Sequence, residues 1–264
     1  MPPKPTIPSS YSVPKVWSPP TAEGQPFGGI NRPTAFPRSE RALPKGEHPL
    51  QLYSLGTPNG QKVSILLEEL NALKGVKYDA WTIKIMESDQ FTSGFTALNP
   101  NQKIPAMYDY GVDGEPIRLF ESGSILLYLA EKYEAFISKD IRTKTETMNW
   151  LFWQVGTAPF IGGGFGHFFY YAPTSFEYCI DRYSMETKRI LHVLELQLEG
   201  KEYVLGSEYS IADIAIFPWI YTGLVTYYKA KEFLNLDEYI NVSRWMKTLL
   251  ARPAVQKGLK VTPF

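Results

Sequence analysis

The order of predicted strands and helices between residues 50 and 132 restricts the fold more than any other feature of this sequence. Alternating apolar residues are typical of strands, and apolar residues that recur at helical spacing are typical of helices. Along this segment the two patterns follow one another as β-α-β and then β-β-α, which predicts an α/β domain. The predicted strands lie at 50–53, 78–83, 106–108 and 117–120, and the predicted helices at 63–73 and 122–132.

The second half of the chain is expected to be helical. Residues 134–140 are interpreted as a linker, and strand signals nearly vanish after it. Ser210 and Asp213 match a capping box, which explains the carboxylate of Asp213 better than a catalytic role does. The glycine-rich run at 160–167 lacks the Lys-Ser/Thr ending and the preceding strand of a phosphate-binding loop, so it is interpreted as a helix break.

The first 49 residues form a proline-rich arm. Twelve of the 21 prolines lie there, and prolines mixed with Gly, Ser and Thr leave no periodic face to bury. A flexible tail is one interpretation. Residues 27–33 carry more apolar and specific polar groups than a tail requires, so the other interpretation is an arm that lies across the folded body.

Composition excludes several classes of partner. Lys and Arg equal Asp and Glu at 27 each, so no net field attracts nucleic acid or an anionic membrane, and a small ligand is expected. No run of about 18 apolar residues is present to span a bilayer. With a single cysteine and no apolar N-terminal segment of the signal-peptide type, we expect a cytoplasmic protein.

Glu121 and Ser122 stand where a short apolar strand meets a helix. The N-terminus of a helix offers unsatisfied N–H groups and a partial positive charge, which suit a ligand carboxylate. Glu121 can bind an ammonium, so the pair is suited to the two charged ends of an amino acid. The competing interpretation is that Ser122 is simply an N-cap.

Two further positions could contact a ligand. If the bond between Ile104 and Pro105 is cis, the Ile104 backbone can pair with a short peptide as an added strand, although a trans proline that opens the strand is the commoner case. Thr57 and Asn59 begin the first helix, where a hydroxyl and an amide N–H would stabilise an anion such as a thiolate. Helix capping by either residue is the alternative.

Other kinds of chemistry have little support. No Cys-x-x-Cys is present, so sulfur chemistry would need a thiol that the protein borrows. His48, His167 and His192 have no ligand-like spacing, and we expect no metal. No Gly-x-Ser-x-Gly elbow marks a serine nucleophile.

In combination these features resemble the cytosolic glutathione transferases, which have a thioredoxin-like N-terminal domain and an all-helical C-terminal domain. The pairs at 104–105 and 121–122 and the capping box are marks of that superfamily. Within it the chain is similar to the nu class, which includes bacterial disulfide-bond oxidoreductases and fungal enzymes related to the yeast nitrogen-regulatory prion protein. The similarity covers roughly residues 27–258, and the matching motifs are Asn31-Arg-Pro33, the segment 52–62, Asp89-Gln-Phe91 and the segment 148–153.

The resemblance implies a role for each matching residue. Glu121 and Ser122 would hold the γ-glutamyl end of glutathione, and the Ile104 backbone would pair with its cysteinyl unit. The turn Thr57-Pro58-Asn59 would bind glutathione, with Thr57 and Asn59 facing the sulfur as the catalytic pair. A second glutathione would contact Asn31, Gln90 and Arg182.

One departure from the class concerns residues 154 and 155. Similar bacterial members have Leu-Gln after Phe-Trp, whereas here the order is Gln154-Val155. Because one residue turns the side chain by about a quarter of a helical turn, either residue could line the pocket.

Three functions follow from the resemblance. The first is a glutathione-dependent disulfide reductase, in which two bound glutathione molecules form oxidised glutathione. The second is a transferase that conjugates glutathione to an electrophile, and the third is a non-enzymatic glutathione-binding regulator.

A homodimer is implied, with an arm at 1–49, a thioredoxin-like domain at 50–133 and a helical domain at 141–264. Aromatic candidates to bind an electrophile are Trp150, Trp153, Phe165 and Tyr170.

Overall fold

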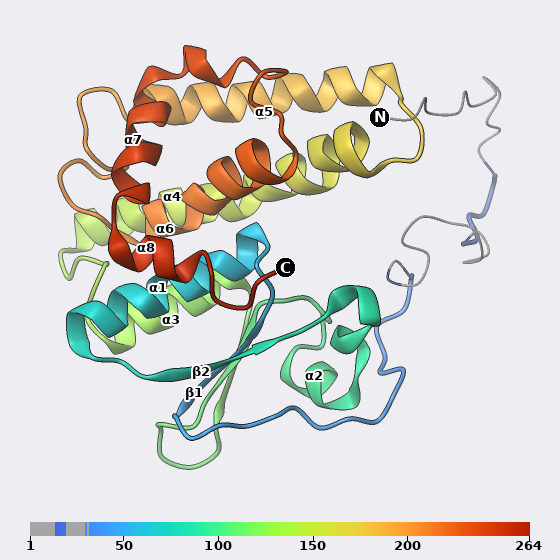
Figure 1. Cartoon of the computed structure of the whole chain (residues 1–264), viewed down its shortest axis with the longest axis vertical. Coiled ribbons are helices and arrows are strands. Elements are labelled where there is room, and N and C mark those ends of the chain that lie inside the picture. The colour runs from blue at the N-terminus through green and yellow to red at the C-terminus, as the bar shows by residue number, and fades with distance from the viewer. Residues whose placement is uncertain (1–13, 20–29, 31) are drawn as a thin grey trace.

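A four-stranded sheet of order β2-β1-β3-β4 organises the N-terminal half (Figure 1). The computed structural model describes residues 14–19, 30 and 32–264. Strands β1 and β2 are parallel, whereas β3 and β4 form an antiparallel hairpin beside β1. Every strand predicted from the sequence is present, with ends that differ by at most one residue. The strands are β1 (Leu50–Ser54), β2 (Tyr78–Thr82), β3 (Ala106–Asp109) and β4 (Ile117–Phe120).

Helices cover both faces of this sheet. Figure 1 shows α1 and α3 between the sheet and the helical half, and α2 on the opposite side. Helix α1 begins where Thr57 Oγ1 accepts a hydrogen bond from the Gly60 N–H, and it ends at Gly75, whose φ of 70° closes the last turn. The elements are α1 (Pro58–Lys74), η1 (Ile85–Glu87), η2 (Asp89–Phe91), α2 (Ser93–Leu98) and α3 (Ser122–Lys132).

The second half is helical, as predicted, and in the described part of the chain no named strand follows β4. One apolar core joins the halves, since β1, α1 and α3 share a buried cluster with α5 and α6. Burial of that shared surface is what fixes the two halves together. The elements are α4 (Ile141–Pro159), η3 (Phe160–Tyr171), α5 (Glu177–Gln197), α6 (Ile211–Pro218), η4 (Trp219–Tyr227), η5 (Leu236–Glu238), α7 (Ile240–Leu250) and α8 (Pro253–Gly258).

The helix break predicted at 160–167 was wrong. The chain continues from α4 as the wider π-helix η3. Its glycines allow aromatic rings to approach the backbone: a Cβ on Gly162 would lie 2.5 Å from the Trp219 ring, and one on Gly166 would overlap Tyr228. The glycines of this run therefore allow close packing. A sequence pattern alone does not show whether a glycine is present for close packing or for flexibility.

The capping box at the start of α6 is confirmed. Ser210 Oγ accepts from the Ala212 N–H, and Asp213 accepts from the Ser210 N–H. Asp213 is fully buried and also accepts bonds from the Val204 N–H and from Trp245 Nε1. These contacts give the carboxylate a structural role, as predicted.

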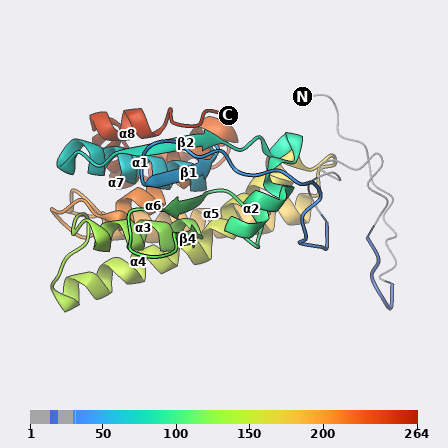
Figure 2. The ribbon, with the colours of Figure 1, turned by 90° about the horizontal axis from the view of Figure 1, so that it is seen from below.

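The described end of the arm lies against the N-terminal half. Arg38 N–H donates to Phe91 O at 2.7 Å, and Ser93 N–H donates to Ser39 O at 2.9 Å. In both Figure 1 and Figure 2 this blue segment passes α2 on its way to β1. Over these residues the arm lies across the folded body. About half of the arm, residues 1–13, 20–29 and 31, lies outside the described residues, and the three domain boundaries stay predictions.

Within the described ranges no helix combines the length and the apolar content needed to cross a bilayer.

Candidate active site

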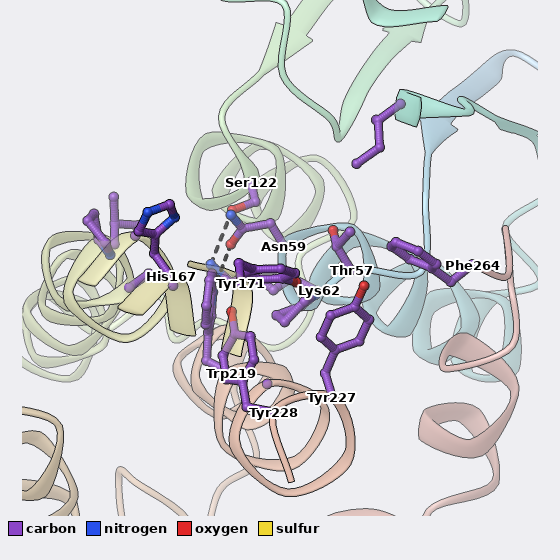
Figure 3. Close-up of a pocket in the computed structure, with 18 of the residues that line it drawn as sticks. Thr57, Asn59, Lys62, Ser122, His167, Tyr171, Trp219, Tyr227, Tyr228 and Phe264 are labelled. Carbon is purple, nitrogen blue, oxygen red and sulfur yellow. Dashed lines mark hydrogen bonds between the residues drawn. The ribbon is translucent and has the colours of Figure 1, made fainter. Parts of the chain in front are cut away.

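A cavity of about 520 Å³ opens where the two halves meet. Its walls come from the first turn of α1, the start of α3, and parts of α4, η3 and η4. Figure 3 shows Thr57, Asn59 and Ser122 at the starts of α1 and α3, facing Trp219 and Tyr227 from η4 and Tyr228, which directly follows η4. Five of the residues predicted to bind glutathione line this one cavity: Thr57, Pro58, Asn59, Glu121 and Ser122.

The first turn of α1 presents two oriented polar side chains. Asn59 Oδ1 accepts a 2.9 Å hydrogen bond from Trp219 Nε1, which fixes the amide with its NH₂ group on the other branch. Thr57 Oγ1 accepts from Gly60 N–H at 3.4 Å, and its O–H is still a donor. With the positive end of the helix dipole, these groups favour an anion at this end of the cavity.

Helix α3 begins without a capping bond from a side chain. Glu121, not Ser122, occupies the N-cap position of α3, and its C=O accepts from the Ile125 N–H. The Glu121 side chain makes no capping bond, so its carboxylate remains available to a ligand. Glu121 has a φ of 67°, a conformation that costs a non-glycine residue of order 1–3 kcal/mol and that is typical of functional sites.

Lys62 is a site residue that sequence reasoning missed. It is fully buried, yet it lines the cavity, and its Nζ donates to Ser122 Oγ at 3.2 Å and to Gln154 Oε1 at 2.6 Å. Desolvation lowers the pKa of Lys62 to about 7, while the negative charge of Glu121 acts to raise it. The sequence pattern did not identify Lys62, because a charged residue of a helix is ordinarily expected to face solvent. Helix α1 is instead buried on nearly all sides, so this lysine is buried as well.

The order of residues 154 and 155 places the apolar one in the cavity. Val155 lines the cavity wall, whereas Gln154 is buried behind it and holds Lys62. Gln154 Nε2 is also buried and has no hydrogen-bond partner among the described residues.

The peptide bond before Pro105 is cis, so of the two alternatives that the sequence left open the less common one is present. Ile104 precedes β3 and packs against a second core cluster with Tyr53 and Phe95. It is not among the residues that line the cavity, and its pairing with a peptide stays a prediction.

Of the three residues predicted to hold a second glutathione, the structure describes two, Gln90 and Arg182. Asn31 lies outside the described residues. Gln90 is buried, and its Nε2 donates at 3.1 Å to the carbonyl of Ile85, which does line the cavity. Arg182 is half exposed on α5, 3.8 Å from Glu186. Neither Gln90 nor Arg182 lines the cavity. These three contacts stay predictions.

The aromatic wall of the cavity differs from the predicted one. Trp150 and Trp153 pack on each other, Phe165 is fully buried, and Tyr170 is half exposed; none of the four lines the cavity. Whether an aromatic side chain faces the cavity depends on the side of the helix from which it projects. The local sequence does not reveal which side of the helix faces the cavity. The residues that form the wall are Tyr171, Trp219, Tyr227, Tyr228 and Phe264.

Two tyrosines of this wall, Tyr171 and Tyr228, are neutral hydrogen-bonding groups. Burial raises the pKa of Tyr228 to about 12, and burial together with a bond to Tyr227 raises the pKa of Tyr171. His167 from η3 lines the same cavity. Over the residues that the structure describes, no three His, Cys, Asp or Glu side chains group as metal ligands.

Comparisons with known proteins agree with this geometry. The E. coli disulfide-bond oxidoreductase YghU is 55% identical over 255 residues, which cover 95% of this chain and 88% of that protein. The glutathione transferase YghU from Streptococcus pneumoniae, solved in complex with glutathione, has a TM-score of 0.92 and 50% identity over 97% of this chain and 99% of its own. A glutathione transferase family member from Pseudomonas fluorescens, solved with two glutathione bound, has a TM-score of 0.76 and 42% identity, over 80% and 92% of the two chains.

Two family models also match the sequence. The model of the glutathione S-transferase N-terminal domain matches residues 48–131, and that of the C-terminal domain matches residues 164–253. Both the expected resemblance and the expected fold class, a thioredoxin-like domain followed by helices, are confirmed. The chain belongs to the glutathione S-transferase family.

Proposed function

We propose that this protein is a glutathione-dependent disulfide-bond reductase. The observation that carries the proposal is an anion site, formed by Thr57, Asn59 and the start of α1, in a cavity that no cysteine lines. Cys179, the single cysteine of the chain, lies on α5. The thiols must therefore come from glutathione. The names of relatives, a disulfide-bond oxidoreductase and a transferase complexed with glutathione, support this reaction.

Chemically, the reaction needs two thiolates in sequence. The first glutathione binds through Glu121 and Ser122 with its sulfur near Thr57 and Asn59, where hydrogen bonds and the helix dipole favour the thiolate. This sulfur attacks one sulfur of the disulfide, the S–S bond breaks, and the departing thiolate takes a proton from solvent. A mixed disulfide between glutathione and the substrate remains.

A second glutathione completes the reaction. Its thiolate attacks the glutathione sulfur of the mixed disulfide and releases the remaining substrate thiolate, which also takes a proton. One disulfide is reduced and two glutathione molecules become one molecule of oxidised glutathione, so the electrons balance without a protein thiol. The Pseudomonas fluorescens relative with two bound glutathione molecules supports this step. We assign the second molecule to Asn31, Gln90 and Arg182.

Conjugation of an electrophile is the second candidate function. The aromatic wall from η3 and η4 would suit an apolar electrophile, and the same thiolate would attack it.

Rates with a small symmetric disulfide and with a halogenated nitrobenzene, each with glutathione, separate the two functions. We expect the rate with the disulfide to be at least about tenfold higher than the rate with the nitrobenzene. We also expect the rate with the disulfide to fall at least about tenfold in Asn59→Ala. A higher rate with the nitrobenzene would favour conjugation instead.

We further propose that the protein acts in the cytoplasm as a homodimer. The balanced charge of the sequence agrees with small-molecule partners, namely glutathione, oxidised glutathione and a small disulfide. We keep 1–49, 50–133 and 141–264 as the boundaries of the arm, the glutathione-binding domain and the helical domain.

A further inference from the structure

Lys62 has a charge that its surroundings do not balance. The side chain is fully buried, and the two partners that the structure assigns to Nζ, Ser122 Oγ and Gln154 Oε1, are neutral. An ammonium has three N–H donors, so two bonds leave one to be directed elsewhere. Figure 3 shows Lys62 and Ser122 among the side chains that gather around the cavity.

A purely structural role does not account for this arrangement. A buried charge without an ion partner is costly, and an apolar side chain of similar length would fill the same space at lower cost. Gln154 makes the cost larger, because its buried Nε2 lacks a hydrogen-bond partner among the described residues. Both residues therefore act together at the cavity, where Lys62 is one of the lining groups.

Glu121 supplies only part of the missing negative charge. Its field acts on Lys62, but the two side chains form no ion pair within 4.0 Å. A zwitterionic ligand would need Glu121 for its ammonium. The anion that Lys62 lacks is then the ligand carboxylate at the start of α3, beside Ser122.

We propose that Lys62 is a specificity-determining residue of the glutathione site, whose ammonium binds the α-carboxylate of the γ-glutamyl group and is held in position by Gln154. This inference rests on the proposed function, because it assumes that glutathione occupies the cavity. It explains why the site uses a buried lysine where a helix N-terminus and Ser122 alone would already bind a carboxylate. The additional charge selects ligands that have that carboxylate.

Binding should then be linked to protons. With a pKa of about 7, roughly half of the Lys62 side chains are neutral at pH 7 in the protein without ligand. A bound carboxylate raises that pKa, so binding takes up protons, and the uptake increases from pH 6 to pH 8. Above pH 7 the affinity falls as pH rises, because binding requires the charged lysine.

Other titratable groups that face the cavity are distinguishable from Lys62. Glu121 comes from the start of α3, His167 from η3, and Tyr171, Tyr227 and Tyr228 from η3 and η4. Burial raises the pKa of Tyr171 and of Tyr228, so these two tyrosines stay neutral between pH 6 and 8. His167 is the group whose ordinary pKa lies in the same range, so a His167→Gln variant is the control for it.

The first measurement is calorimetric titration of the full chain with S-hexylglutathione, in buffers of different ionisation enthalpy at pH 6, 7 and 8. The blocked sulfur removes the thiol proton from the balance. We expect proton uptake that increases with pH in the wild-type protein and in His167→Gln, and none in Lys62→Met. Binding without proton uptake in the wild-type protein would overturn the inference, and so would uptake that persists in Lys62→Met.

The second measurement tests selectivity for the carboxylate. The probes are S-hexylglutathione and its analogue in which 4-aminobutyrate replaces the γ-glutamyl group, so that the ammonium remains and the carboxylate is absent. The wild-type protein should prefer S-hexylglutathione, and Lys62→Met should reduce that preference at least about tenfold. Lys74→Met, at the exposed end of the same helix, should keep the wild-type preference.

The outcomes separate this inference from the proposed function. An unchanged preference in a folded Lys62→Met protein would contradict the role of Lys62 and leave disulfide reduction intact. Disulfide reduction could fail while S-hexylglutathione still binds with proton uptake, which would contradict the proposed reaction alone. A wild-type protein that binds neither probe would contradict both.

Discussion

Two residues at this site combine a stability cost with a charge that binding can use. Lys62 is fully buried beside neutral groups, and Glu121 has a φ of 67° at the start of α3. Each of these features costs stability in the protein without ligand, and each places a charged group at the cavity. Stability and binding should therefore respond in opposite directions when Lys62 is replaced.

Replacement of Lys62 by Met tests this opposition. Because the folded-state pKa of about 7 lies below the ordinary lysine value, the wild-type protein gains stability as pH rises from 7 toward 10, and this gain is absent in Lys62→Met. Without ligand, we expect the variant to be at least as stable as the wild type at pH 7, with a difference that shrinks toward pH 10. Denaturant unfolding at several pH values measures it, and a variant that is less stable at pH 7 would contradict this account of the buried charge.

The elements around the site show what sequence patterns can and cannot predict. Strand alternation and helix signals placed β1 to β4 and α3 within a residue of their ends, since those patterns depend on local burial. The π-helix η3 was not predictable, because rings from distant parts of the chain, Trp219, Tyr183 and Tyr228, pack against its glycines. Much of the aromatic wall comes from η3 and η4, and for this reason its residues were misassigned.

A methyl group on η3 should disturb the site through Trp219. In Gly162→Ala the new Cβ would lie 2.5 Å from the Trp219 ring, which must move and loosen its bond to Asn59. We expect at least about a tenfold loss of disulfide reduction with the fold retained. Gly156→Ala on α4 is the control, since nothing lies within 4 Å of its Cβ and the rate should stay within about twofold. Equal rates for the two variants would contradict the role of Trp219.

The capping box of α6 is predicted to affect stability alone. Asp213→Asn removes a buried carboxylate that accepts bonds from Val204, Ser210 and Trp245, and leaves amide protons without acceptors. We expect a loss of roughly 2–4 kcal/mol in the free energy of unfolding. Glutathione affinity of the folded protein should be unchanged, as measured by calorimetry below the unfolding temperature. A selective loss of affinity without a loss of stability would indicate a functional role for Asp213.

At the scale of the whole molecule, the site exists because two halves share one core. Helices α1 and α3 pack on the sheet with one face and on the C-terminal helices with the other, so their N-termini meet the aromatic wall of η3 and η4. The sequence identified Thr57, Asn59, Glu121 and Ser122, because turn and cap chemistry is local. Lys62 and Gln154 could not be identified in that way, since their hydrogen bond joins positions 92 residues apart.

We propose that bound glutathione, and no protein thiol, reduces the disulfide. Cys179→Ala removes the single cysteine, and the measurement is the amount of oxidised glutathione formed per disulfide reduced, together with the rate. We expect a rate within about twofold of the wild type and one molecule of oxidised glutathione for each disulfide. A collapse of the rate in a folded Cys179→Ala protein would contradict it.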